Sequence, residues 1–186
     1  MKDASLLNES IGQGLFLRRS PLVGAAIEGT IVDLETIGQI HDGRSGFQRY
    51  EDVRPYLLGT LTAEGLSQVY ASSVDVLPPL FEFMLSQWIP GYLLAPLYAY
   101  NTGFERGVIW ASTGHIVDGF RELKVDSLGK EEAVRAYGLG SYDDPFPGAG
   151  IRCMNEFRKG NIEPCLAHNR ACLLKERDLL LLRGYK

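Results

Sequence analysis

The stretch that decides the fold is IEGTIVDLETIG, residues 27–38. Its first part, residues 27–34, is an apolar run with β-branched side chains, which predicts a buried strand. Residues two apart in an extended chain point to the same side, so Asp33 and Glu35 present two carboxylates together. Each anion disfavours ionisation of the other, and Mg²⁺ or Mn²⁺, which prefer oxygen ligands, would remove that cost. Two surface acids at a solvated strand end are the alternative.

Length and charge limit the classes of protein that the chain can represent. It has 186 residues, 45% of them hydrophobic, a formal net charge of −4 and a pI of about 5.4. That length is enough for one domain, which we expect over residues 1–186 with residues 1–26 as an N-terminal arm or edge strand. A net negative charge is unusual for a protein that holds nucleic acid on a broad basic surface. It does not exclude a nuclease, because bound metal ions reverse the local field.

The cysteines and the N-terminus predict a cytoplasmic location. Three cysteines form no paired framework, and residues 1–5 lack the basic start and apolar core of a signal peptide. The chain has no stretch approaching 18 uncharged apolar residues, so we expect no membrane contact through a spanning segment.

Hydrophobic periodicity and turn residues predict an α/β domain. Three strands, at 27–34, 56–61 and 66–70, are expected to form an antiparallel meander. Two further strands are expected at 95–100 and 121–126, and residues 138–150 read as a loop. The expected helices are 73–88 (ended by Pro90), 102–112, 130–137, 151–158 and 162–182. This order predicts a mixed five-stranded sheet flanked by helices, which is the order of a ribonuclease H-like fold.

Two further groups of polar residues follow the first pair of acids. Glu105 lies in the first turn of the helix after strand 95–100, where the helix dipole favours an acid, so a simple helix-start charge is one interpretation. If that strand lies beside strand 27–34, Glu105 approaches the first two acids. On the last helix His168, Cys172 and Glu176 are spaced i, i+4 and i+8 and share one face. A single helical histidine or a cysteine at such a position is commonly structural.

The three groups together resemble a known set of motifs. DLETIG (33–38), AYNTGFE (99–105) and HNRACLL (168–174) are similar, in order, to the three motifs of the DEDD (DnaQ-like) 3′–5′ exonuclease superfamily. The most similar branch is the YprB-like ribonuclease H-like domain, in which the second acid can be Glu and the third motif runs Tyr-Asn-x-x-Asp. The resemblance covers about residues 27–183. It implies a ribonuclease H-like fold and a metal-dependent 3′–5′ exonuclease that hydrolyses phosphodiester bonds of DNA or RNA.

The resemblance also implies roles for individual residues. Asp33 would bridge two Mg²⁺ or Mn²⁺ ions, Glu35 and Glu105 would complete the ligation, and His168 would be the general base. The last acid of the family falls on Cys172, a soft ligand poorly suited to Mg²⁺, so the second ion site is in doubt. Glu176, one turn later on the same face, is the acid that could replace it.

Substrate and partners follow from the same resemblance. The implied substrate is a single-stranded nucleic-acid end, and its contacts would be Thr36, Tyr100, Asn101, Phe104, Asn169 and Arg170. Small members of the superfamily often pair or work beside another enzyme, which leaves a homodimer or a partner enzyme open. The change at Cys172 favours a second hypothesis, a catalytically weak or inactive module that binds nucleic acid or protein. An unrelated α/β domain with chance motifs is the third.

Overall fold

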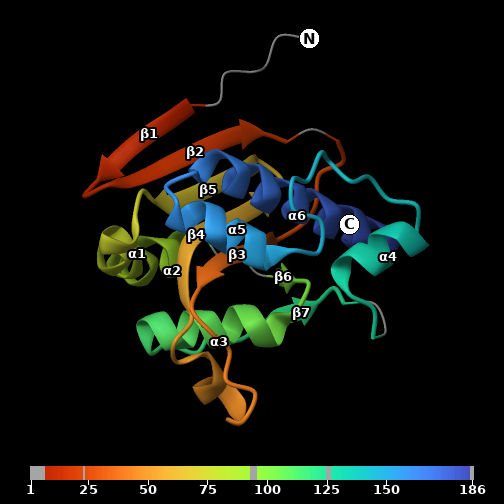
Figure 1. Ribbon diagram of the computed structural model, residues 1–186. Helices are drawn as coiled ribbons and strands as arrows, with labels where there is room; N and C mark the ends of the chain where they lie inside the picture. Colours follow the sequence, from red (N-terminus) through yellow and green to blue (C-terminus); the bar gives the residue numbers. More distant parts are fainter. Residues whose placement is uncertain (1–6, 23, 93–95, 125–126, 185–186) are drawn as a thin grey trace.

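The computed structural model describes residues 7–22, 24–92, 96–124 and 127–184. Over these residues the chain is an α/β protein with a mixed seven-stranded sheet in the order β1-β2-β5-β4-β3-β6-β7 (Figure 1). The strands are β1 (Leu7–Gly12), β2 (Leu15–Pro21), β3 (Thr30–Ile37), β4 (Arg54–Thr62), β5 (Gly65–Ala71), β6 (Leu97–Ala99) and β7 (Phe120–Glu122). The α/β class that the sequence predicts is therefore confirmed.

The antiparallel meander that the sequence predicts is β3-β4-β5, and it forms the middle of the sheet. On the other side of β3, β6 pairs with it in parallel and β7 pairs in parallel with β6. This places the strand that precedes Glu105 directly beside the strand that carries Asp33 and Glu35. The expected strand start at Ala95 and the expected strand end at residues 125–126 lie outside the described residues.

The prediction of five strands is wrong, because part of the expected N-terminal arm is a hairpin, β1–β2, that adds to the free edge of β5. The pair Arg18-Arg19 hides the strand pattern of β2. Arg18 is nonetheless buried, and its Nη1 donates to Glu163 Oε2 at 2.8 Å. Because Glu163 is 145 residues from Arg18 in the chain, no local sequence pattern predicts this contact.

The helical segments are a 3₁₀ turn η1 (Gly46–Tyr50), a 3₁₀ turn η2 (Val74–Val76), α1 (Leu77–Phe83), a π-helical segment η3 (Met84–Trp88), α2 (Ile89–Tyr92), α3 (Thr102–Thr113), α4 (Lys130–Ala136), α5 (Gly150–Arg158) and α6 (Ile162–Leu182). The predicted stop at Pro90 is wrong. The π-helical segment η3 already departs from the i→i−4 hydrogen-bond pattern directly before Pro90, since the N–H of Ile89 bonds to the carbonyl oxygen of Met84, and the helical path continues to Tyr92. Among the described helices none is long and apolar enough to cross a membrane.

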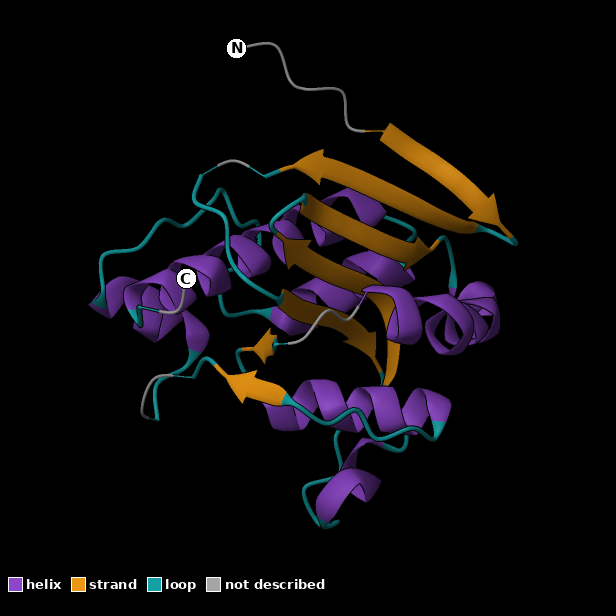
Figure 2. Ribbon diagram, turned by 180° about the vertical axis from the view of Figure 1, so that it is seen from behind, coloured by secondary structure: helices purple, strands orange, loops and turns teal. Residues whose placement is uncertain are grey.

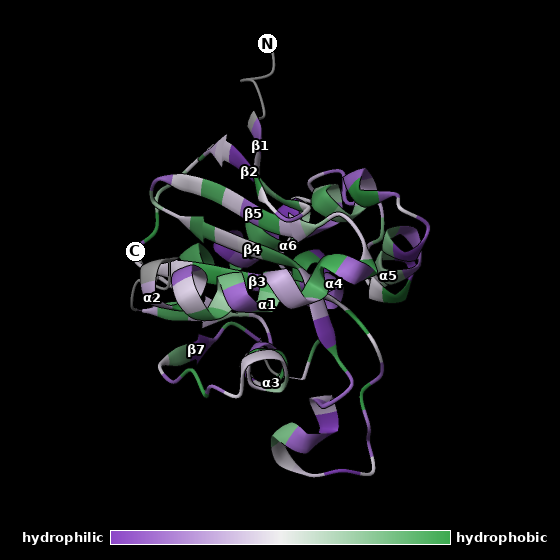
Figure 3. Cartoon of the chain, turned by 90° about the vertical axis from the view of Figure 1, so that its left-hand side faces the viewer, coloured by the Kyte–Doolittle hydropathy of each residue, from purple (hydrophilic) through white to green (hydrophobic). Residues whose placement is uncertain are grey.

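The sheet is covered by helices on both faces. Figure 1 shows α5 and α6 in front of the central strands, and Figure 2 shows the same strands from behind, with these two helices beyond them. Side chains alternate along β3, so Asp33 faces α6 whereas Val32 and Leu34 face the other way and pack in one cluster with Leu80 and Ile109. Hydrophobic residues recur along β4 and β5 between the layers (Figure 3). The acids of β3 therefore lie between the sheet and α6.

Gly38 sets the point where β3 ends. Its φ is +106°, and a Cβ atom there would overlap the carbonyl oxygen of Asp52. Only glycine fits this backbone without strain. The chain thus turns away from the sheet directly after Glu35-Thr36-Ile37, which leaves the end of β3 open on one side.

Candidate metal centre

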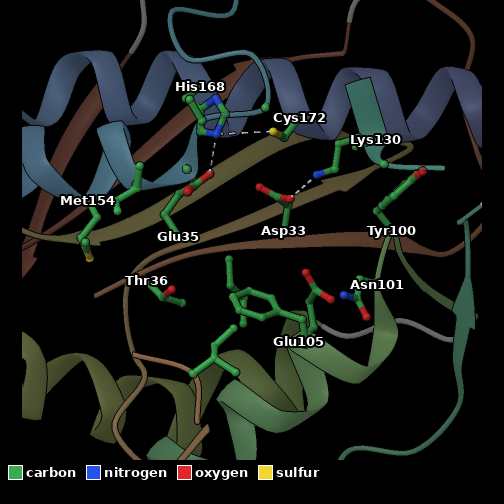
Figure 4. A pocket seen from close by; sticks show the side chains of 18 of the residues that line it. Asp33, Glu35, Thr36, Tyr100, Asn101, Glu105, Lys130, Met154, His168 and Cys172 are labelled. Carbon is green, nitrogen blue, oxygen red and sulfur yellow. Dashed lines mark hydrogen bonds and ion pairs between the residues drawn. The ribbon is translucent and has the colours of Figure 1, made fainter. Parts of the chain in front are cut away.

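A cleft of about 810 Å³ opens at the carboxyl end of β3, between α3, α4, α5 and α6. Its lining brings together residues from all three motifs of the sequence (Figure 4). They include Asp33, Glu35, Thr36, Tyr100, Asn101, Phe104, Glu105, Lys130, His168 and Cys172. Most of the predicted site residues, which lie up to about 140 positions apart in the chain, thus surround one space.

Asp33 is held on both sides. The side-chain Nδ2 of Asn169 donates to its Oδ2 at 2.8 Å and to its carbonyl oxygen at 3.0 Å. The Lys130 ammonium donates to its Oδ1 at 2.7 Å. Only 5% of Asp33 is exposed, so the protein fixes the orientation of this carboxylate before any ligand arrives.

Asn169 owes its position to Gly59 and Gln68. Asp33, Gly59 and Gln68 are paired side by side across β3, β4 and β5. Gly59 leaves room for the amide of Asn169, and Gln68 Nε2 donates to Asn169 Oδ1 at 2.9 Å. The prediction of Asn169 as a substrate contact is wrong, because its side chain is fully buried and its amide is used inside the protein.

Glu35 and Glu105 complete the acidic wall of the cleft. Burial, and then the charge of Asp33, raise the pKa of Glu35 to about 8. Burial, and then the charges of Glu176 and Asp33, raise the pKa of Glu105 well above its ordinary value. The Oε2 atom of Glu105 is buried and has no hydrogen-bond partner among the described residues. Both carboxyl groups are therefore close enough to Asp33 for its charge to oppose their ionisation.

Glu176 reaches the site through Lys130. Lys130 Nζ lies 2.5 Å from Glu176 Oε1 as well as 2.7 Å from Asp33, so one ammonium bridges two acids. Glu176 is completely buried, and its Oε2 has no hydrogen-bond partner in the ranges that the structure describes. Burial raises its pKa to about 8 even though Lys130 opposes this. Glu176 therefore turns toward the site, as we expected from its place on α6, and the group that it contacts there is the Lys130 ammonium.

His168 is oriented by a residue that the sequence did not reveal. Its Nδ1 lies 2.6 Å from Asp144 Oδ1, and Asp144 Oδ2 accepts from Lys175 at 2.6 Å. Burial alone would lower the pKa of His168, but the bond to Asp144, the bond to Cys172 and the charge of Glu35 together outweigh it and raise the pKa to about 11. The other ring nitrogen, Nε2, faces the cleft 3.8 Å from Glu35 Oε1.

Cys172 lies beside the same imidazole. Its Sγ is 3.9 Å from His168 Nε2, and burial raises the pKa of its thiol to about 11. One potential ligand atom from each of Glu35, His168 and Cys172 lies within 4.8 Å of the other two. The position where the family acid was expected thus carries a buried thiol on the cleft wall.

The predicted substrate contacts separate into two groups. Thr36, Tyr100, Asn101 and Phe104 line the cleft. Arg170 is exposed and is not part of the lining, and the prediction of a substrate contact there has no support from its position. Arg170 is two residues after His168, so it points about 200° around α6 from the cleft face.

Lys130, Asp144 and Lys175 are the site residues that sequence reasoning missed. Lys130 reads only as the first residue of a short helix, and Asp144 as one of the polar residues of a Gly- and Pro-rich loop. Lys175 is fully buried on α6, where it pairs with Asp144 and Glu131. Their partners lie between 24 and 97 residues away in the chain, and no local pattern predicts such pairings.

The donor set fits a hard divalent cation. Four carboxyl groups, those of Asp33, Glu35, Glu105 and Glu176, are buried at the site, and Lys130 neutralises part of their charge. Within the described part of the chain, Glu105 Oε2 and Glu176 Oε2 have no hydrogen-bond partner, which is costly unless a cation or a proton binds. No protein-family model, no curated protein and no solved structure matches the chain.

Proposed function

We propose that the chain is a ribonuclease H-like 3′–5′ exonuclease that hydrolyses phosphodiester bonds of DNA or RNA with Mg²⁺ or Mn²⁺. The observation that carries the proposal is that three buried carboxyl groups, those of Asp33, Glu35 and Glu105, line one cleft, while a fourth, that of Glu176, is buried beside Lys130. Among the described residues, Glu105 Oε2 and Glu176 Oε2 have no hydrogen-bond partner. The arrangement of β3 between antiparallel β4 and parallel β6, followed by the helix that carries Glu105, supports the same assignment.

Asp33, Glu35 and Glu105 are the residues that would hold the metal. Asp33 is fixed by Asn169, while the other two present carboxyl groups whose pKa values are raised by burial and by neighbouring acids. Glu176 joins them if Lys130 moves, and the second of the two expected ions depends on that exchange. When bound, Mg²⁺ or Mn²⁺ polarises the phosphate and makes a coordinated water more acidic.

His168 is placed to take the proton of the attacking water. Asp144 binds Nδ1 and fixes the ring, so that Nε2 is the nitrogen directed at the cleft. A cation held by Glu35 would favour the neutral imidazole that a base requires. Asp144 then stabilises the imidazolium that forms, in the way that a carboxylate orients histidine in hydrolases.

The remaining lining is suited to a single-stranded end. Tyr100 and Phe104 offer aromatic rings and Asn101 an amide at the wall formed by the end of β6 and the start of α3. Base stacking on aromatic rings is tolerant of sequence. Phe104 also packs edge-on against Tyr50, with 5.9 Å between the ring centroids, so its ring is held in place.

The experiment is an exonuclease assay on 5′-labelled single-stranded DNA and RNA with Mn²⁺ or Mg²⁺. We expect stepwise shortening by the wild-type chain and its loss in Asp33→Asn and Glu105→Gln. Asp118→Asn, an acid that pairs with Arg106 and is not part of the cleft lining, serves as the control and should remain active. Absence of shortening with either metal, or equal activity in Asp33→Asn, would contradict the proposal.

A second candidate function is a module that binds nucleic acid or protein without cutting. Two observations favour it: a thiol replaces the last acid, and the Lys130 ammonium lies between Asp33 and Glu176. Fluorescence anisotropy with a labelled single strand separates the two functions. Binding without shortening supports the module, whereas metal-dependent shortening excludes it.

A further inference from the structure

The three ligand atoms of Glu35, His168 and Cys172 form a compact group inside the cleft. His168 Nε2 is 3.8 Å from Glu35 Oε1 and 3.9 Å from Cys172 Sγ, and no pair of the three is more than 4.8 Å apart. All three residues are buried, yet all three line the cleft. We propose that they form a binding position for a thiophilic divalent cation such as Zn²⁺, and that its occupation switches the proposed exonuclease off.

The spacing is close to what a tetrahedral ion requires. With Zn–N near 2.0–2.1 Å and Zn–S near 2.3 Å, ligand atoms in a tetrahedron are about 3.3–3.6 Å apart. The two nearest separations here are longer by a few tenths of an ångström, which small rotations of Glu35 and Cys172 can remove. The fourth position faces the cleft, so water or an anion can complete the ion's coordination.

The residues behind the group support a metal rather than a plain buried histidine. A metal-bound imidazole usually donates its second N–H to a carboxylate, which fixes the ring and makes the ligating nitrogen more basic. Here Asp144 is that carboxylate, since its Oδ1 lies 2.6 Å from His168 Nδ1. Lys175 Nζ in turn donates to Asp144 Oδ2 at 2.6 Å. Nε2 is thereby the nitrogen left for an ion, and it is the one that faces Glu35 and Cys172.

The chemistry of the donors separates this position from that of the hard cation. Thiolate and imidazole are ligands that suit Zn²⁺, whereas Mg²⁺ prefers the carboxylates of Asp33 and Glu105. Coordination requires the thiolate of Cys172 and an unprotonated Nε2. The proton of the Cys172 thiol and any proton on His168 Nε2 pass to solvent as the ion binds. The positive charge of the ion then takes the place of these protons beside the Glu35 carboxylate.

Occupation of this position removes two parts of the proposed machinery. Glu35 becomes a ligand of the thiophilic ion, and His168 Nε2 can no longer accept a proton from water. This consequence rests on the proposed function, whereas the binding position itself does not. The two parts of the proposal are therefore tested separately.

Binding is tested with Co²⁺, a spectroscopic probe for Zn²⁺ sites, titrated into the full chain without nucleic acid. A thiolate-to-cobalt charge-transfer band that saturates at one equivalent and is abolished by Zn²⁺ is expected. Cys172→Ser should lose the band and His168→Gln should weaken it. Cys165→Ser, at a buried cysteine that does not line the cleft, should keep it. Absence of the band in the wild type, or its persistence in Cys172→Ser, would overturn the binding position.

Inhibition is tested by adding Zn²⁺ to the exonuclease assay in excess Mn²⁺. The Zn²⁺ concentration for half inhibition should be at least about tenfold higher in Cys172→Ser than in the wild type or Cys165→Ser, the low end of the loss typical for a disturbed metal site. Equal inhibition of all three chains overturns the switch. A cobalt band together with no exonuclease activity under any metal overturns the proposed function and the switch, and leaves the binding position established.

Discussion

Asn169 on α6 donates its side-chain amide to both the carboxylate Oδ2 and the carbonyl oxygen of Asp33 on β3, at 2.8 and 3.0 Å. The two residues are 136 positions apart, and this pair of bonds ties the last helix to the central strand of the sheet. The same amide accepts from Gln68 on β5. Asn169 is thus a positioning residue, because it orients Asp33, which is a ligand of the proposed metal.

Replacing Asn169 with Ala should lower both stability and metal affinity. The change leaves buried polar atoms of Asp33 and Gln68 with fewer partners, which costs about 1 to 3 kcal/mol. Urea unfolding measures the first effect and Mn²⁺ titration the second. Asn169→Asp should be worse than Asn169→Ala near neutral pH, because it buries a carboxylate against Asp33. Equal stability of wild type and Asn169→Ala would show that the bonds are not needed.

Gly59→Ala should disturb the same contact by sterics alone. A Cβ atom at Gly59 would lie 2.7 Å from Asn169 Nδ2 and closer still to Oδ1, so the amide must shift away from Asp33. We expect a loss of about 1 to 3 kcal/mol in the free energy of unfolding. Gly43→Ala, where a Cβ meets nothing within 4 Å, is the matched control and should be nearly neutral. In a double-mutant cycle with Asn169→Ala, additive losses would contradict the contact.

The parts of the fold that the sequence predicts are those with a local pattern. The meander β3-β4-β5 follows from runs of apolar, β-branched residues and a short turn, and α6 follows from its length and periodicity. The same patterns place Asp33, Glu35, Glu105 and His168 on the right elements. Their approach to one cleft was expected on the condition that strand 95–100 lies beside the central strand, and the pairing of β6 with β3 meets that condition.

The parts that the sequence could not predict depend on contacts between distant residues. The hairpin β1–β2 was obscured because Arg18 is buried through its pairing with Glu163 and its bond to Asn8. Asp144 lies in a loop whose composition indicates turns and gives no sign of His168 as its partner. In the sequence Lys130 is only a charged residue at the start of a helix. Its pairing with Asp33 depends on the packing of α4 beside β3. Buried ion pairs of this kind become visible only with the tertiary structure.

Asp144→Asn should bring the pKa of His168 down toward its ordinary value near 6.5. The change removes the negative charge that holds the imidazolium, while burial, which favours the neutral ring, remains. NMR titration of the imidazole measures the pKa directly. Asp143→Asn, at the exposed neighbouring residue, is the control and should leave the pKa of His168 where it is. A His168 pKa unchanged in Asp144→Asn would contradict the pairing.

The same pair predicts how stability depends on pH in the metal-free chain. The pKa of His168 is raised to about 11, so its contribution is fully present below about pH 6.5 and is lost as pH rises through 11. Burial would raise the pKa of Asp144, but bonds from His168 and Lys175 lower it to about 2. Its contribution is therefore present above about pH 3.8 and is lost as pH falls toward 2. Urea unfolding at several pH values should show the wild type losing its advantage over Asp144→Asn at both extremes.

Lys130→Met should make stability depend more strongly on the metal. The ammonium that bridges Asp33 and Glu176 is removed, which leaves two buried acids without a cation and destabilises the metal-free chain. A divalent cation can then bind these acids without displacing Lys130, so the rise in Tm on adding Mn²⁺ should exceed that of the wild type. Lys159→Met, which removes an exposed ion pair with Glu156, is the control. An equal rise in Tm for all three chains would show that Lys130 and the metal do not compete.

The central claim is that Asp33, Glu35 and Glu105 form a site for a hard divalent cation. Titration of Mn²⁺ into the full chain, with free Mn²⁺ followed by electron paramagnetic resonance, tests it without any assumption about substrate. The account predicts saturable binding by the wild type and an affinity at least about tenfold weaker in Asp33→Asn and Glu105→Gln, while Asp118→Asn binds normally. Mn²⁺ binding that is absent from the wild type, or unchanged in Asp33→Asn, would contradict it.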